Sequence, residues 1–358
     1  MEQNLKSEKE SNILANYNLS ELESFLLDII KPKYRIKQIF DAILQAKDMN
    51  ELNIPKEMIT KLSENYILKP LKIHTVLKSK DGTKKYLLQL NDGNIFESVF
   101  LTQSYGNTIC LSTQVGCRMG CSFCASTAKG LIRNLTAGEM LAAIAIINAD
   151  NGQKTERNFS NIVLMGSGEP LDNFDNVTKF LYLVTDKNGF NLSERNISLS
   201  TCGLVNKIYD LMKLKLNINL CISLHASTDE IRQKIMPVAK AYSINEIVKA
   251  VFDYAKYTKR RVILEYCLIK GVNDSFDDCE RLVKLFKNVL CHFNVINLNP
   301  KDDKQSPVAK KSAYAFVQKL NDLGLSATLR RSQGSDIEGA CGQLKVKFEQ
   351  NDEKNSKK

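Results

Sequence analysis

The chain has 358 residues, of which 43% are hydrophobic, and carries a formal net charge of +10 at pH 7. No apolar run approaches the roughly 20 residues that a membrane-spanning helix requires. The N-terminus, MEQNLKSEKESN, is polar and has no basic stretch leading into an apolar one, as a secretion signal would. We therefore expect a cytoplasmic protein without membrane association. The positive charge favours a polyanionic partner, and a general excess of surface lysine is the alternative.

Both ends of the chain, residues 1–17 and 346–358, are charged and poor in aromatic residues, which predicts disorder. Residues 18–69 are predicted to form a helical accessory domain, because apolar residues recur at helical spacing in SELESFLLDIIKPKYRIKQIFDAILQ. Basic residues surround Tyr34 in this stretch and either bind phosphate or simply face solvent: Lys31, Lys33, Arg35 and Lys37.

Residues 70–106 predict a short antiparallel β-hairpin extension. Three apolar or alternating runs, KIHTVLKS, TKKYLLQL and NIFESVFL, are separated by the turn pairs Asp81-Gly82 and Asp92-Gly93. Such pairs between alternating runs are typical of hairpins.

From residue 107 to residue 345 strand-like and helix-like runs alternate, which predicts a parallel sheet. The six strand-like runs are NTICLST, NIVLMG, NISLST, INLCISLH, RVILEYCLI and FNVINLNP. Thr136 followed by Glu139 fits a capping box at the start of the first helix. The expected fold class is therefore α/β, with an open or complete barrel of the (β/α)6 type. In such folds the loops after the strands carry the chemistry.

Polar residues and glycines follow several of these strands, in GSGEP at 166–170, STCG at 200–203, SLH at 223–225 and NP at 299–300. Glycine lets a backbone approach a ligand closely, and an acid such as Glu169 can accept hydrogen bonds from an ammonium group. Without cysteines nearby, GSGEP would be interpreted as an ordinary turn.

The stretch CLSTQVGCRMGCSFCAST, residues 110–127, contains four of the ten cysteines. Disulfides are uncommon in a reducing compartment, so clustered cysteines are more often ligands or catalysts. Soft thiolates hold zinc or iron–sulfur clusters. Structural zinc sites usually contain a second CxxC pair, and none follows in this sequence. The glycines and Arg118 within the stretch interrupt any apolar face, which argues against three core cysteines.

The spacing of Cys117, Cys121 and Cys124 resembles the CxxxCxxC loop of radical S-adenosylmethionine (SAM) enzymes, and Phe123 matches the aromatic residue usual before the last cysteine. The resemblance implies one 4Fe-4S cluster, held by these three thiolates, with S-adenosyl-L-methionine bound to the fourth iron. GSGEP looks like the GGEP-type segment of that superfamily. Gly168 and Glu169 would then hold the methionyl ammonium of the cofactor.

A longer series of motifs resembles the bacterial adenine carbon-2 RNA methyltransferases. From about residue 20 to residue 345 the matching segments are, in order, YRIKQIF, CLSTQVGCRMGCSFCAST, NLTAGE, GSGEPLDN, ISLHA, MPV, GVNDS and DIEGACGQL. Enzymes of this family have dual specificity. They act on one adenine of 23S ribosomal RNA, before the ribosome is fully assembled, and on the adenine next to the anticodon of certain transfer RNAs. The resemblance implies the same partners here, with an electron donor such as flavodoxin or ferredoxin.

The resemblance also assigns catalytic roles to Cys341, Cys110 and Glu97. Carbon 2 of adenine is electron-poor and does not attack the methyl group of SAM directly. Cys341 is implied to accept that methyl first, since thiolates are the strongest protein nucleophiles near neutral pH. A second SAM then provides the radical chemistry, which makes two SAM per turnover. Cys110 is implied to release the product by forming a disulfide with Cys341, and Glu97 to accept the carbon-2 proton. Without the family, Glu97 would be interpreted as a solvent-facing acid on an edge strand.

Further cofactor-binding positions follow from the same motifs: Ser200, Ser223, Leu224, His225 and Asn299. For His225 we expect ring and backbone contacts rather than metal binding. The remaining cysteines fall in or near apolar runs and are interpreted as core residues: Cys202, Cys221, Cys267, Cys279 and Cys291.

Three positions depart from the family pattern: Ser167 between the two glycines, Cys202, and VINLNP at the last strand. They bear on cofactor geometry rather than on the reaction class. A sister group of antibiotic-resistance enzymes methylates carbon 8 of the same ribosomal adenine with the same cysteines. Pro170 favours carbon 2, because the sister enzymes tend to have alanine there.

Candidate RNA contacts are the basic clusters Lys84-Lys85, Lys259-Arg260-Arg261 and Arg330-Arg331. The target adenine has to leave its stack to reach a site at the rim of a barrel. Two rival interpretations are a non-catalytic RNA-binding protein and a simple iron–sulfur electron carrier. Neither interpretation accounts for Cys110 and Cys341 together with the GSGEP segment at 166–170.

Overall fold

The computed structural model describes residues 12–104, 106–152, 156–300 and 305–344. The predicted disordered tail at 346–358 lies outside these ranges, as do residues 1–11 of the predicted disordered N-terminus.

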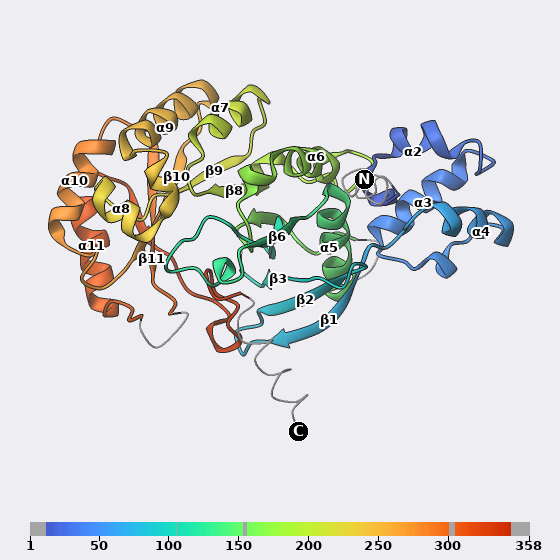
Figure 1. The fold of residues 1–358 in the computed structure, drawn as a ribbon, viewed down its shortest axis with the longest axis horizontal. Coiled ribbons are helices and arrows are strands. Elements are labelled where there is room, and N and C mark those ends of the chain that lie inside the picture. The colour runs from blue at the N-terminus through green and yellow to red at the C-terminus, as the bar shows by residue number, and fades with distance from the viewer. Residues whose placement is uncertain (1–11, 105, 153–155, 301–304, 345–358) are drawn as a thin grey trace.

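Ten strands within the described ranges form one sheet, in the order β1 (Leu71–Lys78), β2 (Lys84–Leu90), β3 (Ile95–Leu101), β4 (Thr108–Cys110), β7 (Asn161–Leu164), β8 (Ile197–Thr201), β9 (Asn219–Ser223), β10 (Val262–Leu268), β11 (Cys291–Asn297) and β12 (Ala327–Leu329). The pairs from β1 to β4 are antiparallel. All pairs from β4 to β12 are parallel. The sheet curves into a barrel that stays open, because β1 and β12 stand at opposite ends of the order (Figure 1).

The predicted α/β fold class, a partial (β/α)6-type barrel, is confirmed. All six predicted strands are present and neighbour one another in chain order. The structure adds β12, a parallel strand that the sequence did not predict because three residues are too few for a periodic pattern. The predicted hairpin extension is continuous with the barrel, since Val99 of β3 pairs with Cys110 of β4.

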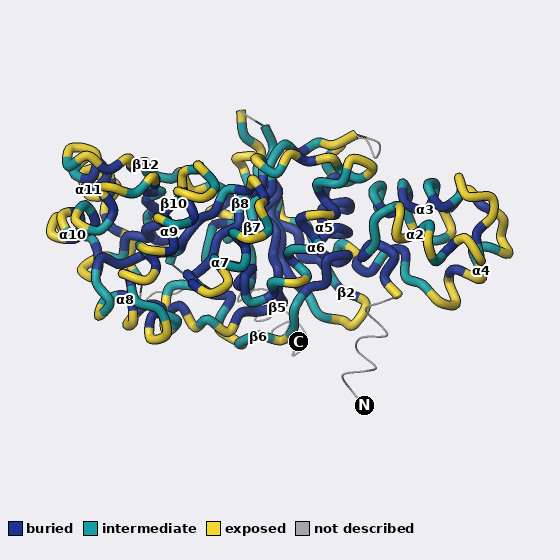
Figure 2. Tube along the Cα trace, turned by 90° about the horizontal axis from the view of Figure 1, so that it is seen from above, coloured by how far each residue is buried: buried dark blue, intermediate teal, exposed yellow. Residues whose placement is uncertain are grey.

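Helices cover the outer face of the sheet: α5 (Ala137–Asp150), α6 (Phe174–Thr185), α7 (Val205–Lys213), α8 (Asp229–Ile235), α9 (Ile244–Thr258), α10 (Phe276–Phe286) and α11 (Lys310–Asp322). The predicted capping box at α5 is confirmed, since the Thr136 hydroxyl accepts from the Glu139 N–H and the Glu139 carboxylate accepts from the Thr136 N–H. Neither α8 nor α11 was predicted from the sequence. Apolar side chains of α11 join those of the strands and of most other helices in a continuous core that runs along the sheet (Figure 2), whereas Ile235 of α8 belongs to a smaller cluster.

Shorter elements connect these layers. The hairpin β5 (Gln114–Gly116) and β6 (Leu131–Asn134) flanks the cysteine loop. Single turns of 3-10 helix are η1 (Leu14–Asn16), η2 (Met49–Glu51), η3 (Ala125–Thr127), η4 (Pro170–Asn173), η5 (Glu194–Asn196), η6 (Pro237–Lys240) and η7 (Ser335–Ile337).

The N-terminal helices α2 (Leu19–Leu26), α3 (Tyr34–Leu44) and α4 (Lys56–Asn65) pack around a second apolar core. They lie at one end of the molecule, beyond α5 and α6 (Figures 1 and 2). Leu44 packs against both this core and that of the barrel. The boundary at residue 69 therefore stays a prediction.

The prediction of disorder up to residue 17 is wrong for the part that is described. Ile13, Leu14 and Ala15 are buried, because their apolar side chains fill the helical core. The Asn16 side chain also accepts a hydrogen bond from the Gly138 N–H at the start of α5 (2.6 Å). Charge composition alone missed this short apolar anchor.

Candidate active site

A cavity at the carboxyl ends of the parallel strands brings the three predicted cluster ligands together. Cys117, Cys121 and Cys124 all line it, from the loop between β5 and β6. The Cys117 N–H donates to the Gly130 carbonyl (3.0 Å), which closes the loop at its base. Gly116 has a φ of +77°, and a Cβ atom there would collide with the Gly130 oxygen. A glycine is therefore required where the loop begins.

These three thiols are compatible with a 4Fe-4S cluster. In the described part of the chain, no three His, Cys, Asp or Glu side chains stand close enough to hold one metal ion. A 4Fe-4S cluster makes no such demand, because each of its thiolates binds a different iron. Burial raises the pKa of Cys117 and of Cys121 to about 12, so both are neutral thiols without a nearby positive charge. Bound iron would supply that charge and deprotonate them.

Glu169 fastens two rim loops of this cavity. Its carboxylate accepts hydrogen bonds from the N–H groups of Leu171 (3.0 Å) and Cys202 (2.7 Å). Burial raises the pKa of this carboxyl, and the backbone donors counteract that effect. Gly168 lies beside it with a φ of +106°, and a Cβ atom there would clash with the Gln114 side chain. Gly168 and Glu169 both line the cavity, as the sequence predicted for a cofactor site.

The two predicted serines lie side by side on β8 and β9. Their Oγ atoms are 3.4 Å apart, and the Ser200 hydroxyl donates to the Glu265 carboxylate (2.7 Å). Both serines line the cavity. Leu224 does not, because its side chain lies in the barrel core. A cofactor role for Leu224 is therefore restricted to its backbone, whose N–H already donates to the Glu265 carbonyl (3.0 Å).

His225 lines the cavity as a neutral ring. Its Nδ1 accepts the Cys267 N–H (2.9 Å), so the ring proton sits on Nε2. Burial lowers the His225 pKa to about 3. The ring also meets Phe123 edge to face, with centroids 4.9 Å apart. Contact of this ring with a cofactor stays a prediction.

A second cavity begins on the other side of Cys341. Cys341 and Asn299 line both cavities, whereas Cys110 lines the second one only. The Asn299 side chain accepts a hydrogen bond from the Ser332 hydroxyl (3.2 Å). Burial, and then the proximity of the Cys341 thiol, raise the pKa of Cys110 to about 12. The two thiols predicted to act together are therefore neighbours.

The segment that carries Cys341, residues 334–344, crosses the open side of the barrel and is tied at both ends. The Gly334 N–H donates to the Asp81 carboxylate (2.8 Å), and the Ser79 hydroxyl donates to the Asp336 carboxylate (2.5 Å). Past Cys341, the Gly342 carbonyl accepts the Ala125 N–H from the cysteine loop (2.7 Å). Cys341 is thereby held beside the cluster ligands.

Two cysteines that were interpreted as core residues, Cys202 and Cys267, are buried as expected and also line the first cavity. Cys202 belongs to the STCG motif at the end of β8, so its place after a strand was a usable signal. Cys267 is near the end of β10, where the apolar run RVILEYCLI concealed it. Cys221 is fully buried, in agreement with the prediction. The sequence also gave no sign of Gln114 and Glu265, which line or brace the cavity.

Glu97 is neither solvent-facing nor on an edge strand. Strand β3 lies between β2 and β4, and the Glu97 side chain is 2% exposed. Its Oε1 atom is 3.3 Å from the Lys85 Nζ. The carboxylate is not among the groups lining either cavity, because the Cys341 segment crosses this face of the sheet.

One predicted RNA contact, Lys85, is wrong, and a second, Arg330, lines the second cavity and has a partner inside the barrel. Lys85 is buried, and Arg330 points into the barrel, where it donates to the Glu265 carboxylate (3.3 Å). The cluster at residues 259–261 precedes β10 and so lies at the end of the sheet opposite the cavity.

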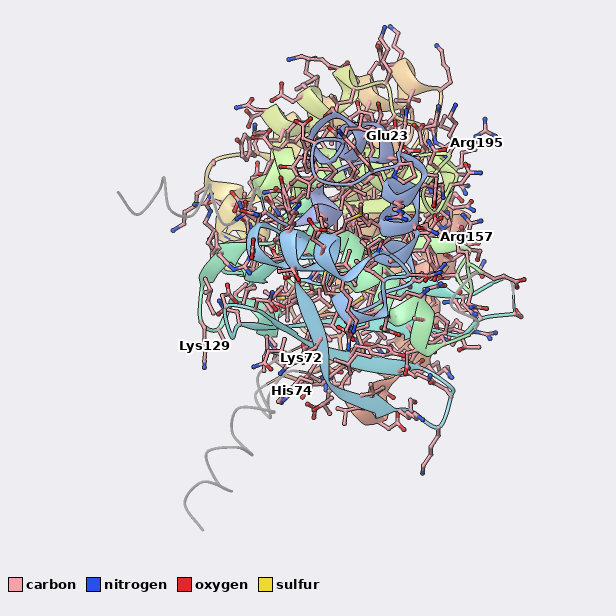
Figure 3. The ribbon with its side chains drawn as sticks, turned by 90° about the vertical axis from the view of Figure 1, so that its right-hand side faces the viewer. Glu23, Lys72, His74, Lys129, Arg157 and Arg195 are labelled. Atoms are coloured by element: carbon pink, nitrogen blue, oxygen red, sulfur yellow. The ribbon has the colours of Figure 1, made fainter. Side chains whose placement is uncertain are left out.

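Exposed cations remain elsewhere. Lys129 of the cysteine loop and Lys72 of strand β1 are both exposed, and both are labelled in Figure 3. Lys129 points outward at the edge of the molecule in that view. On α3, Tyr34 is 60% exposed and contacts the Arg35 guanidinium. Lys33 is paired with Glu23.

Comparison with known proteins matches a family model described as "Radical SAM superfamily" to residues 111–286. A relative from Clostridioides difficile (strain 630) is 48% identical over 345 residues, which are 95% of this chain and 99% of the relative. A relative from Clostridium perfringens (strain 13 / Type A) is 49% identical over 344 residues, 94% of this chain and 97% of the relative. Both are named "Probable dual-specificity RNA methyltransferase RlmN". The chain belongs to the RlmN family.

A solved structure supports this assignment. The crystal structure titled as a radical SAM methyltransferase from Sphaerobacter thermophilus has a TM-score of 0.89 and 38% sequence identity, covering 93% of this chain and 99% of that one. Membership of the RlmN family makes the chain an enzyme, a radical SAM RNA methyltransferase, and it implies a 4Fe-4S cluster and SAM. Among the described helices of this RlmN-family chain, none has the length and hydropathy of a membrane span.

Proposed function

We propose that this enzyme methylates carbon 2 of a specific adenine in 23S ribosomal RNA, and of the adenine next to the anticodon in some transfer RNAs, through a methylated Cys341. The observation that carries the proposal is the position of Cys341 between two cavities. One is lined by the three cluster cysteines and the other by Cys110.

The residues of the first cavity fit the two groups that the family implies. Cys117, Cys121 and Cys124 would hold the cluster, and Gly168, Glu169, Ser200, Ser223, His225 and Asn299 would surround SAM. When bound, these groups supply the methyl group and the one-electron chemistry that an electron-poor ring carbon requires. We expect two SAM molecules to be consumed per turnover, one for each of these contributions.

The chain's own side chains perform the polar steps. The Cys341 sulfur accepts the methyl group as a thiolate. The one-electron chemistry of the bound cofactor would remove one hydrogen atom from this methyl group and, once its carbon has bonded to carbon 2 of the base, take up the surplus electron, which leaves the enzyme linked to the RNA. Glu97, two residues before Val99 of the second cavity on strand β3, would take the proton from carbon 2, directly or through one water molecule. The Cys110 thiolate attacks the Cys341 sulfur, so that a sulfur–sulfur bond forms as the sulfur–carbon bond breaks. The electron pair of the broken bond stays with the carbon, which takes up a proton to become the methyl group.

Partner proteins and RNA complete the proposal. We propose that the helices α2 to α4 contact RNA, because Tyr34 is exposed beside a guanidinium and can stack on a base. The substrate RNA is expected to be open enough to release a base, as ribosomal RNA is before full assembly. A small electron donor such as flavodoxin or ferredoxin would reduce the cluster in the cytoplasm.

The test is mass spectrometry of nucleosides from protein-free ribosomal RNA and from transfer RNA. The RNA is treated anaerobically with reconstituted enzyme, SAM and reductant. We expect 2-methyladenosine from the native enzyme and none from Cys341→Ala. The matched control is Cys291→Ser, which changes a cysteine remote from both cavities and keeps activity. Product carrying 8-methyladenosine would move the chain to the carbon-8 sister group, and methylation by Cys341→Ala would overturn the mechanism.

A further inference from the structure

A buried ion pair on the inner face of the sheet joins Glu97 to a lysine that has no part in the functions described so far. Lys85 Nζ and Glu97 Oε1 are 3.3 Å apart, and the two side chains are 7% and 2% exposed. Removing two charges from water costs more than such a pair regains, unless further hydrogen bonds satisfy them. Well-packed apolar residues would serve stability at least as well. The pair therefore suggests a role other than stabilising the fold.

The strand register explains why these two side chains meet. Lys85 of β2 is directly opposite Val99, and Glu97 of β3 is opposite Leu87. Lys85 and Glu97 are therefore diagonal neighbours on one face, within reach of long side chains. The preceding residue, Lys84, points to the other face and pairs with Asp150 of α5 (3.2 Å).

The same lysine also contacts the segment that carries Cys341. Its Nζ donates to the Glu338 carbonyl (3.3 Å), three residues before Cys341. Further along, Leu344 packs on Val99 and Cys110 of the same sheet face. One ammonium group thus links the acid on β3 to the backbone that holds the methyl-carrying thiol.

We propose that Lys85 is the positioning residue for proton removal from the substrate adenine. Its ammonium group pairs with the Glu97 carboxylate and holds it in one orientation, and the Glu338 carbonyl anchors that ammonium group in turn. The inference rests on the proposed role of Glu97 as proton acceptor. A carboxyl buried this deeply without a cation would favour its neutral form, which cannot accept a proton. An ammonium has three donors, enough to serve the carboxylate and the Glu338 carbonyl together.

This role affects one step only. Transfer of a methyl group to Cys341 needs no base at adenine, so it proceeds without Lys85. Resolution of the covalent adduct between Cys341 and RNA needs the carbon-2 proton to leave first. Loss of Lys85 should therefore leave enzyme that methylates itself and captures RNA but releases product slowly.

The experiment compares Lys85→Met, Lys85→Arg and Glu97→Gln, with Lys213→Met, an exposed lysine on the outer helix α7, as the control. Three readouts are taken anaerobically: methylation of Cys341 by peptide mass spectrometry, covalent RNA adduct on denaturing gels, and 2-methyladenosine. General-base catalysis typically contributes about 10²- to 10⁴-fold. We expect Lys85→Met to keep Cys341 methylation, to accumulate adduct and to form product at least about tenfold more slowly, with part of the rate restored by Lys85→Arg and none lost by Lys213→Met.

A double variant protects the test against simple misfolding. Lys85→Met combined with Glu97→Gln buries no charge, and it should resolve adduct no more slowly than Glu97→Gln alone, because both changes disable one unit. The inference is overturned if Lys85→Met makes product at the native rate, or if it loses Cys341 methylation to the same extent as product. If Glu97→Gln itself resolves adduct normally, the proposed role of Glu97 fails instead, and the two failures are distinguishable.

Discussion

The Glu169 carboxylate accepts a hydrogen bond from the Cys202 N–H at 2.7 Å, and this contact joins the loop after β7 to the loop after β8. A second bond, from the Leu171 N–H, caps the following turn. The carboxylate therefore shapes the rim before any ligand arrives. Its remaining lone pairs face a cavity lined by the cluster cysteines.

Glu169→Gln should weaken SAM binding without unfolding the enzyme. The amide keeps one acceptor oxygen for the rim loops but loses the charge that would attract the methionyl ammonium. Charge-assisted hydrogen bonds contribute about 1.5–3 kcal/mol, so we expect at least a tenfold rise in the SAM dissociation constant. Equilibrium dialysis with the reconstituted enzyme measures it. The control is Glu57→Gln, which changes an exposed acid on α4. Equal SAM affinities for the native enzyme and both variants would mean that Glu169 does not bind SAM.

Gly116→Ala should reduce the iron content of the reconstituted enzyme. At a φ of +77° an alanine Cβ would collide with the Gly130 oxygen and spread the base of the cysteine loop. Gly130→Ala is a matched control, because its φ is +68° and nothing lies within 4 Å of the added atom. The left-handed backbone alone costs roughly 1–2 kcal/mol, and it acts in both variants. Iron and sulfide assays on both variants measure the effect of the collision beyond that shared cost. Equal iron contents would mean that the collision with the Gly130 oxygen does not affect the cluster site.

The parts of the site that could be predicted follow from local patterns. Strand order placed the motifs at 166–170, 200–203 and 223–225 on one rim, because parallel strands end at the same edge. The spacing of the three cluster cysteines likewise needs only a short loop. These positions depend on neighbours in the sequence.

The parts that were missed depend on contacts between distant segments. Lys85 and Arg330 looked like surface cations, yet both point inward because the 334–344 segment folds back across the barrel. That segment has no hydrophobic periodicity from which its path across the barrel could be predicted. Cys267 was missed for a similar reason. It lies in an apolar strand, and only the fold shows that the end of this strand reaches the cavity.

His225→Asn should make the unfolding free energy of the cluster-free protein less sensitive to acid. The His225 pKa of about 3 in the folded state lies well below its ordinary value of 6.5, so the neutral ring stabilises the fold above pH 6.5. As the pH falls from 6.5 towards 3, the unfolded chain takes up a proton that the folded one does not. The loss is about 1.4 kcal/mol per pH unit.

Urea titrations at pH 7 and pH 5 measure this difference in native and variant protein. The asparagine side chain can still accept the Cys267 N–H, so the variant retains that contact. The native protein should lose more stability between the two pH values than the variant does. An equal loss in both would mean that His225 is protonated in the folded state.

Arg330→Met and Arg331→Met should differ, although the residues are adjacent. Arg331 is exposed, so its loss should weaken RNA binding and reduce the slope of log affinity against log salt by about one unit. Arg330 is paired with Glu265 inside the barrel, so its loss leaves a buried carboxylate uncompensated. Breaking such pairs costs about 3–5 kcal/mol, and less here because Arg330 is partly exposed. Salt-dependent RNA binding and thermal melting measure the two effects. A reduced salt slope for Arg330→Met, with unchanged melting, would return Arg330 to the RNA-binding surface.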